Sequence, residues 1–171
     1  TTPGSGDVVT SLAFSPSGET LAYGTTQGTV SVWRLRSSKA NDTIQLGQHG
    51  GSEENRIRSV AFTDDRHVMS VARDGTVYEW TLGGARASGR SRYQFGLRHV
   101  THAIGHLKKG WQIAAGMASS SQKERVEIRD LQGELIRRID LREGRYARVL
   151  AVNRQGTRLA LGVEIPPPAS R

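Results

Sequence analysis

The stretch QGTVSVWRL, residues 27–35, returns near the middle of the chain as DGTVYEWTL, residues 74–82. The match extends upstream, because VVTSLAFSPSGETLAYGTTQGTVSVWRL (8–35) aligns with IRSVAFTDDRHVMSVARDGTVYEWTL (57–82). Gly28 and Gly75 are 47 residues apart, and so are Trp33 and Trp80. A segment spelled twice at a fixed period is typical of a repeat architecture.

Each unit reads as short strands separated by turn-forming residues. In the first unit, strands are expected at residues 9–14, 21–25 and 29–35, with a fourth at 43–46. The segments between the first three strands are SPSG and TQG, which consist of residue types that reverse a strand. The second unit follows the same plan, with its fourth strand expected at 93–95.

The repeat continues in the second half of the chain with lower sequence similarity. GWQIAAG (110–116) aligns with GETLAYG (18–24), and VEIRDLQG (126–133) aligns with VSVWRLRS (30–37). Here Arg129 replaces the tryptophan, and Asp130 supplies an aspartate that the earlier copies lack. ARVLAVNRQGTRLALG (147–162) repeats residues 9–24 before three prolines that cannot donate to a strand ladder. The chain therefore reads as three four-stranded units and half of a fourth.

Four strands at a period of about 40–50 residues are the signature of a β-propeller blade. The chain resembles the WD-repeat propellers in LAFSPSG with GTVSVWRL, and in VAFTDD with DGTVYEWTL. The resemblance implies an all-β fold of four-stranded antiparallel blades in an incomplete ring of about 3.5 blades. We expect one domain over 1–171, with blades at 8–46, 56–96 and 99–141, a half blade at 146–163, and a tail at 164–171.

The chain departs from the family pattern in three ways. The aspartate expected after each tryptophan is Arg34 in one unit and Thr81 in the next. The Gly-His pair that often opens such a repeat is missing, unless His49 or His99 stands in. The aspartate of the turn before the third strand is present in the second unit only, as Asp74. We therefore expect the side-chain hydrogen-bond network that ties such blades together to be incomplete.

Several residues recur at the repeat period and are assigned structural roles. The aromatic residues are expected to be core residues that pack one blade on the next, and the aspartates belong to the repeat pattern. These residues are Phe14, Trp33, Phe62, Trp80, Asp74 and Asp130.

An incomplete ring leaves open sheet edges, and unpaired backbone groups at an edge favour aggregation. Three explanations remain open. The sequence is a portion of a longer protein, it closes a ring by associating with copies of itself, or it is a small open propeller covered by another chain.

The composition points to a cytoplasmic protein. Hydrophobic residues make up 36% of the chain, and 20 of its 171 residues are glycine, which fits many short strands joined by tight turns. Cysteine is absent, which excludes disulfides and thiolate zinc sites. No run of 18 apolar residues is present, so no membrane partner is expected.

The residues that could carry metal or catalytic chemistry do not form a recognisable site. On a helix, His99, His102 and His106 would gather on roughly one side, but they fall where the repeat places a strand. The serines precede no nucleophile turn, and no glycine-rich phosphate loop is present. We expect neither an enzyme, a metal site nor a bound cofactor.

Binding is better supported, because a propeller presents loops on rigid sheets and WD-repeat proteins commonly hold partners there. Several arginines are expected on one rim, where guanidinium groups pair with carboxylate or phosphate. The candidate rim residues are Gln27, Arg56, Arg58, Arg73, Arg98, His99, Arg145 and Tyr146. We predict a non-catalytic scaffold or recognition module for a protein or acidic peptide, as the sensing part of a larger, bacterial-type signalling protein.

Nucleic acid is the alternative partner, because the formal net charge is +8 and 20 of the 24 basic residues are arginine. The arginines are scattered along the chain, which favours the protein partner.

Overall fold

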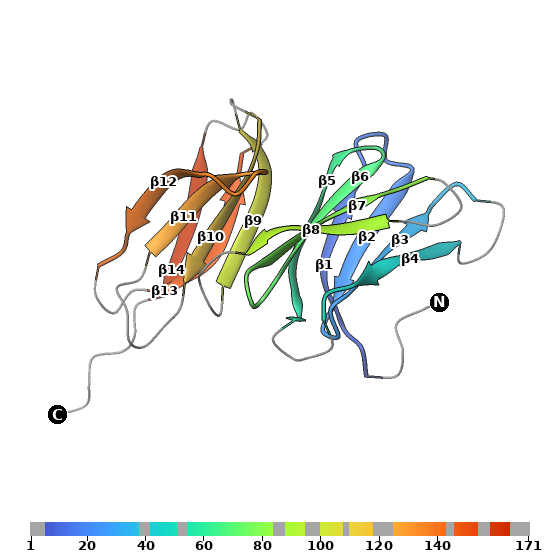
Figure 1. The fold of residues 1–171 in the computed structure, drawn as a ribbon, viewed down its shortest axis with the longest axis horizontal. Coiled ribbons are helices and arrows are strands. Elements are labelled where there is room, and N and C mark those ends of the chain that lie inside the picture. Colours follow the sequence, from blue (N-terminus) through green and yellow to red (C-terminus); the bar gives the residue numbers. More distant parts are fainter. Residues whose placement is uncertain are drawn as a thin grey trace. The chain divides into compact units, whose positions relative to one another are not determined.

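The computed structural model describes residues 6–37, 42–50, 55–83, 88–94, 100–107, 110–117, 125–142, 146–153 and 158–164. All fourteen elements assigned within these ranges are β-strands (Figure 1). Among the same residues, no helix has the length and apolar character needed to cross a membrane.

The strands form antiparallel sheets in which sequence neighbours pair with one another. The first sheet contains β1 (Val9–Phe14), β2 (Thr20–Thr25), β3 (Thr29–Arg34) and β4 (Thr43–Gln48). The second contains β5 (Ile57–Asp64), β6 (His67–Ala72), β7 (Thr76–Thr81) and β8 (Ser88–Gln94). The third contains β9 (Val100–Leu107), β10 (Gly110–Met117), β11 (Arg125–Asp130) and β12 (Leu135–Asp140). The fourth pairs β13 (Tyr146–Val152) with β14 (Leu159–Glu164).

These sheets confirm the predicted fold class, an all-β arrangement of four-stranded antiparallel blades. The chain divides into two compact units, residues 1–96 with the first two sheets and residues 97–171 with the other two. The sequence predicted a single domain over the same residues. That the units together form one ring stays a prediction.

The repeated glycine of QGTV and DGTV is explained by the turn that precedes the third strand of each sheet. Gly28 has a φ of 81° and Gly75 a φ of 86°, a left-handed conformation that residues with a side chain rarely adopt. The amide of each donates to the carbonyl three residues earlier, Thr25 O at 3.3 Å and Ala72 O at 3.0 Å. The turn therefore needs glycine at this position in both units.

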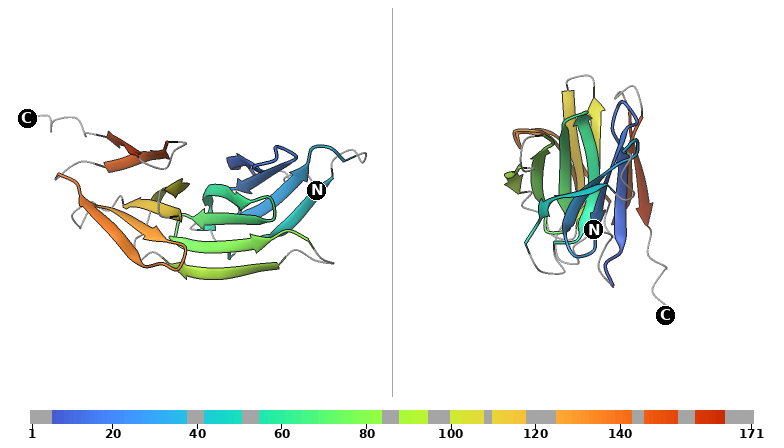
Figure 2. Two further views of the ribbon diagram at one scale, coloured as in Figure 1. Left: turned by 90° about the horizontal axis from the view of Figure 1, so that it is seen from above. Right: turned by 90° about the vertical axis from the view of Figure 1, so that its right-hand side faces the viewer.

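The core of the first unit lies between the first and second sheets, which face one another (Figure 2). Strand alternation places one face of each sheet in this interface. The buried residues of the first sheet are Ala22, Val30, Val32 and Leu46. Those of the second sheet are Ile57, Val60, Phe62, Val68, Ala72 and Trp80.

The aromatic residues of the repeat divide between core and surface. Phe62 and Trp80 are 4% and 3% exposed, as core residues are. Phe14 and Trp33 are 65% and 41% exposed, so they lie outside the core of the described residues, and their packing on another blade stays a prediction. Both lie on the face of the first sheet opposite to the interface, and no described residue covers that face.

A chain of buried hydrogen bonds links the first sheet to the second. The Trp80 indole Nε1 donates to Ser70 Oγ at 2.7 Å, and the same oxygen lies 2.7 Å from His49 Nε2. The Trp80 ring lies over Gly47 and Gly89, where any side chain would collide with it. His49, which directly follows β4, stands in for the histidine of the Gly-His pair, but its buried Nδ1 has no hydrogen-bond partner among the described residues, so the network is incomplete in the second sheet, as predicted.

The aspartates of the repeat pattern shape turns. The Asp74 carboxylate accepts from Thr76 N at 2.8 Å and from Thr76 Oγ1 at 2.6 Å, which closes the turn before β7. Asp130 Oδ1 accepts from the amides of Gln132 and Glu134, both at 2.9 Å, in the turn before β12. Each carboxylate therefore holds a turn that links two strands of one sheet.

The third sheet has charged side chains where the second has tryptophan and tyrosine. Glu127 is 1% exposed, and its carboxylate lies 2.8 Å from Arg129 Nη2, 3.0 Å from Arg125 Nε and 3.2 Å from Arg138 Nη2. Burial alone would raise the pKa of Glu127, but the three guanidinium groups hold that pKa below its usual range. An ion cluster therefore replaces the stacked rings of Tyr78 and Trp80, whose centroids lie 5.2 Å apart in the second sheet.

Candidate partner-binding surface

Three of the predicted rim arginines converge at one end of the second sheet. Arg56 immediately precedes β5, Arg58 is the second residue of β5, and Arg73 lies in the turn between β6 and β7. The amide of Arg73 donates to the carbonyl of Arg56 at 2.9 Å, so the two backbone segments lie side by side. We call Arg56, Arg58 and Arg73 the arginine cluster.

A β-bulge distinguishes Arg58 from its neighbours in β5. Ile57 pairs with Ala72 and Ser59 pairs with Val71, so the register shifts across Arg58. A bulge leaves its extra residue unpaired and redirects the side chain. Arg58 is exposed there, although Ile57 beside it is fully buried.

The three guanidinium groups of the arginine cluster repel one another. Partial burial, followed by the charges of Arg56 and Arg73, lowers the pKa of the Arg58 guanidinium. Nε of Arg56 is buried and has no hydrogen-bond partner among the described residues. An incoming anion would relieve the mutual repulsion of these groups, and arginine can hold carboxylate or phosphate through two parallel hydrogen bonds.

The turn that contains Gln27 lies next to the segment that leads into the arginine cluster. Gly28 is in close contact with that segment, because a Cβ at Gly28 would lie 2.9 Å from Asn55 O. Gln27 itself is exposed, and its backbone N–H donates to Asp7 Oδ1 at 3.1 Å. Sequence reasoning missed Asp7 and Asn55, because both lie outside the repeated segments and carry no pattern of their own.

For the other four predicted rim residues, the structure describes no side chain. Arg98, His99 and Arg145 lie outside the described residues. Tyr146 is the first residue of β13, in the second compact unit, and its side chain is not among those described. The structure therefore brings three of the eight predicted residues into one cluster and places Gln27 in a turn close to it.

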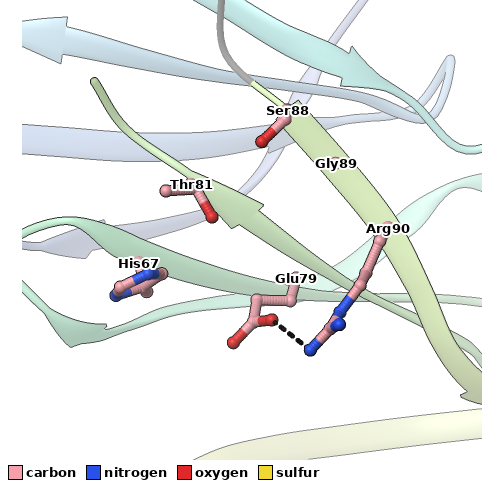
Figure 3. A pocket seen from close by; sticks show the side chains of 6 residues that line it. All are labelled: His67, Glu79, Thr81, Ser88, Gly89 and Arg90. Carbon is pink, nitrogen blue, oxygen red and sulfur yellow. Dashed lines mark hydrogen bonds and ion pairs between the residues drawn. The ribbon is translucent and has the colours of Figure 1, made fainter. Parts of the chain in front are cut away.

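A polar pocket of about 410 Å³ lies over β6, β7 and β8 of the second sheet. Figure 3 shows Glu79 and Arg90 joined across β7 and β8 by an ion pair, whose closest N···O distance is 3.5 Å. His67 Nδ1 lies 2.8 Å from Asp64 Oδ2. The six lining residues are His67, Glu79, Thr81, Ser88, Gly89 and Arg90. Because the lining carries both a carboxylate and a guanidinium, its charges largely cancel, and the arginine cluster attracts anions more strongly.

The histidines considered as metal ligands lie on a strand where they are described. His102 and His106 belong to β9, as the repeat predicted, and His99 lies outside the described residues. Within the described part of the chain, no three histidine or acidic residues are grouped so as to hold a metal ion.

Residues 1–34 and 43–81 match the family model "WD domain, G-beta repeat". The matched residues lie in the first two sheets, so this part of the chain is similar to WD40 repeats. The four-stranded antiparallel sheets are those of a partial β-propeller, and over the first two sheets the chain is similar to WD40 repeats. WD40 domains are in general protein-interaction scaffolds and are typically non-catalytic.

Among curated proteins, the chain is distantly related to Striatin-4. The mouse protein is 32% identical over 116 residues and the human protein 31%, which covers 66% of this chain. The WD repeat-containing protein 91 homolog of Dictyostelium discoideum is 29% identical over 79 residues, 46% of this chain. The chain spans only 15% of the length of Striatin-4 and 10% of the Dictyostelium protein. None of these three relatives is bacterial, so they give no support to the predicted bacterial origin.

Solved structures show the same fold at low sequence identity. The β-propeller domain of Myceliophteria thermophila Cps50 (Swd1) superimposes with a TM-score of 0.65 at 14% identity, over 91% of this chain and 49% of that one. The computationally designed Ika4 protein has a TM-score of 0.58 at 20% identity, over 93% of this chain and 92% of its own. At these identities the likeness shows the fold alone.

Proposed function

We propose that this chain is a non-catalytic recognition module that binds an acidic segment of a partner protein through the arginine cluster. The observation that carries the proposal is the convergence of Arg56, Arg58 and Arg73 at one end of the second sheet, with Arg58 set out of register by a bulge. Rigid strands on both sides fix the backbone from which the three side chains project. A preorganised set of guanidinium groups suits carboxylate or phosphate.

The setting we propose is a larger signalling or effector protein, in which this module senses the partner. The chain spans 15% of Striatin-4, so a relative of this chain occurs within a much longer polypeptide. A WD40 repeat region in such a protein supplies a docking surface, while other parts of that protein act on what is docked.

The test compares two double variants with the same change in charge. Arg58→Glu with Arg73→Glu reverses two charges of the arginine cluster. Arg137→Glu with Arg142→Glu reverses two exposed arginines in and after β12. Fluorescence anisotropy with labelled acidic, phosphoserine and neutral peptides measures binding. We expect the first variant to lose roughly tenfold or more in affinity for an anionic peptide and the second to lose less than about twofold.

Equal affinity of the cluster variant and the unchanged protein for the anionic peptides would contradict the proposal. The same assay with an oligonucleotide addresses the polyanion alternative, which the net charge of +8 suggests. Contact with many phosphates gives an affinity that falls steeply as salt rises. Weaker salt dependence and a preference for the peptide are expected here.

A further inference from the structure

One face of the first sheet is both apolar and exposed. Val9, Leu12, Phe14 and Trp33 are 39%, 60%, 65% and 41% exposed. Leu12 and Phe14 alternate along β1 with Ala13, which packs into the core on the other side. We call these four residues the open face. A contiguous patch of exposed large apolar residues commonly marks an interaction surface.

The second sheet shows the same face in a covered state. Ile57, Val60, Phe62 and Trp80 occupy the equivalent places in the repeat, and all four are buried. What covers them is the back of the first sheet, where β1 and β2 contribute the small residues Ala13, Ala22 and Gly24. The chain therefore contains its own example of how such a face is covered.

Small residues let the covering strands approach closely. Ala13 and Ala22 are cross-strand partners in β1 and β2, and both belong to the core that contains Phe62. Gly24 lies directly against the Ile57 side chain, which would collide with any Cβ at that position. In this interface the covering strands present an alanine pair and a glycine two residues further along the second strand.

The fourth sheet exposes that same set of small residues. Ala151 and Ala160 are cross-strand partners in β13 and β14, as Ala13 and Ala22 are in β1 and β2. Gly162 follows Ala160 by two residues, as Gly24 follows Ala22.

Ala151, Ala160 and Gly162 are all exposed. On the opposite side of β14, Leu159 and Leu161 pack against the buried Val126 and Ile128. The outward side of the fourth sheet, defined by Ala151, Ala160 and Gly162, is called the small-residue face.

We propose that the chain self-associates head to tail, with the open face of one copy packed on the small-residue face of a second copy. The contact reproduces the packing of the second sheet on the first. Phe14 and Leu12 take the places of Phe62 and Val60 over the alanine pair, and Val9 takes the place of Ile57 over Gly162. Because the two faces differ, the contact is heterologous. Each copy can use its open face for one neighbour and its small-residue face for another.

The experiment uses the full chain and measures native mass by light scattering and sedimentation over a range of concentrations. Phe14→Glu spoils only the open face, and Ala160→Arg spoils only the small-residue face. Each variant alone lacks one half of the contact and is expected to be a monomer. An equimolar mixture restores one intact contact, since Ala160→Arg retains its open face and Phe14→Glu retains its small-residue face. The mixture is therefore expected to contain heterodimers.

Leu135→Glu is the matched control, because Leu135 is an exposed strand residue, 44% exposed, outside both faces. It is expected to associate as the unchanged chain does. Circular dichroism checks that each variant is folded, and Leu12→Glu replaces Phe14→Glu if that variant is not. An unchanged chain that stays monomeric at all concentrations overturns the proposal. Persistent self-association of Ala160→Arg alone also overturns it, because the open face would then be packing on something else.

Discussion

The first and second sheets contain nearly the same nine-residue segment, yet Trp33 is 41% exposed and Trp80 is 3% exposed. The two tryptophans have equivalent neighbours in sequence and different neighbours in space. Trp80 has the hydroxyl of Ser70 as a hydrogen-bond acceptor and glycines on both sides of its ring. The position equivalent to Ser70 in the first sheet is Tyr23, so the short hydroxyl side chain that accepts from Trp80 is replaced there by a large aromatic one.

The difference teaches that a repeat unit specifies its strands but does not bury its own tryptophan. Trp80 is buried because the preceding sheet contributes Gly47 and His49 from the end of β4. In repeat proteins, stability is largely the sum of such nearest-neighbour interfaces. Within the described residues, no sheet lies against Trp33 to make the equivalent contribution.

The largest expected effect comes from truncating the two tryptophans in turn. Trp80→Ala removes a fully buried ring and leaves a cavity between the two sheets, so the free energy of unfolding should fall by about 3–5 kcal/mol. Trp33→Ala removes a ring that is already in contact with water, so its cost should be about 1 kcal/mol or less. Urea unfolding followed by far-ultraviolet circular dichroism measures both. Equal losses in the two variants would mean that the sheets do not differ as described.

Acid should weaken the second sheet through His49. Burial lowers the pKa of His49 to about 4, against a smaller opposing effect of the Asp74 charge. Between about pH 6.5 and pH 4 the unfolded chain binds a proton at this position and the folded chain does not. The free energy of unfolding should therefore fall as the pH falls through this window, by about 3 kcal/mol in total at this site.

His49→Phe tests that assignment by removing the titrating group while keeping a ring in the core. The variant should lose most of the decline in stability between about pH 6.5 and pH 4. His67→Gln is the matched control, because His67 is partly exposed and paired with Asp64. A decline that persists unchanged in His49→Phe would assign the acid sensitivity to other groups.

The sequence predicted most strands and turns well because these depend on local chemistry, but the fourth strand of the second sheet, expected at 93–95, spans Ser88–Gln94. The glycines at 28 and 75, the turn residues and the strand alternation are all encoded within a few residues. The burial of Phe14 and Trp33 could not be predicted in this way, because it depends on what covers a sheet. The role of His49 in the hydrogen-bond network was also hard to predict, since Gln48 separates it from Gly47 and no Gly-His pair is present there. The arginine cluster was found from the positions of its members in the repeat, whereas the bulge at Arg58 has no signature in the sequence.

The smallest effect should come from the turn before the third strand, where the second unit has Asp74 and the first has Gln27. Asp74→Ala removes two hydrogen bonds from Thr76 and should cost about 1 kcal/mol at neutral pH. Gln27→Ala removes an exposed side chain and should change stability by less than about 0.5 kcal/mol. Thermal and urea unfolding of the two variants measures this contrast.

Asp74→Asn separates the turn from the charge, because an amide oxygen still accepts from Thr76 N. At neutral pH it should restore most of the stability that Asp74→Ala loses. In acid it should not, since the Asp74 charge raises the pKa of His49 and thereby helps the folded chain to accept a proton. Without that charge, the pKa of folded His49 falls further and the decline of stability continues to lower pH. If the free energy of unfolding declined in the same way in acid for Asp74→Asn and the unchanged chain, Asp74 would act on the turn alone.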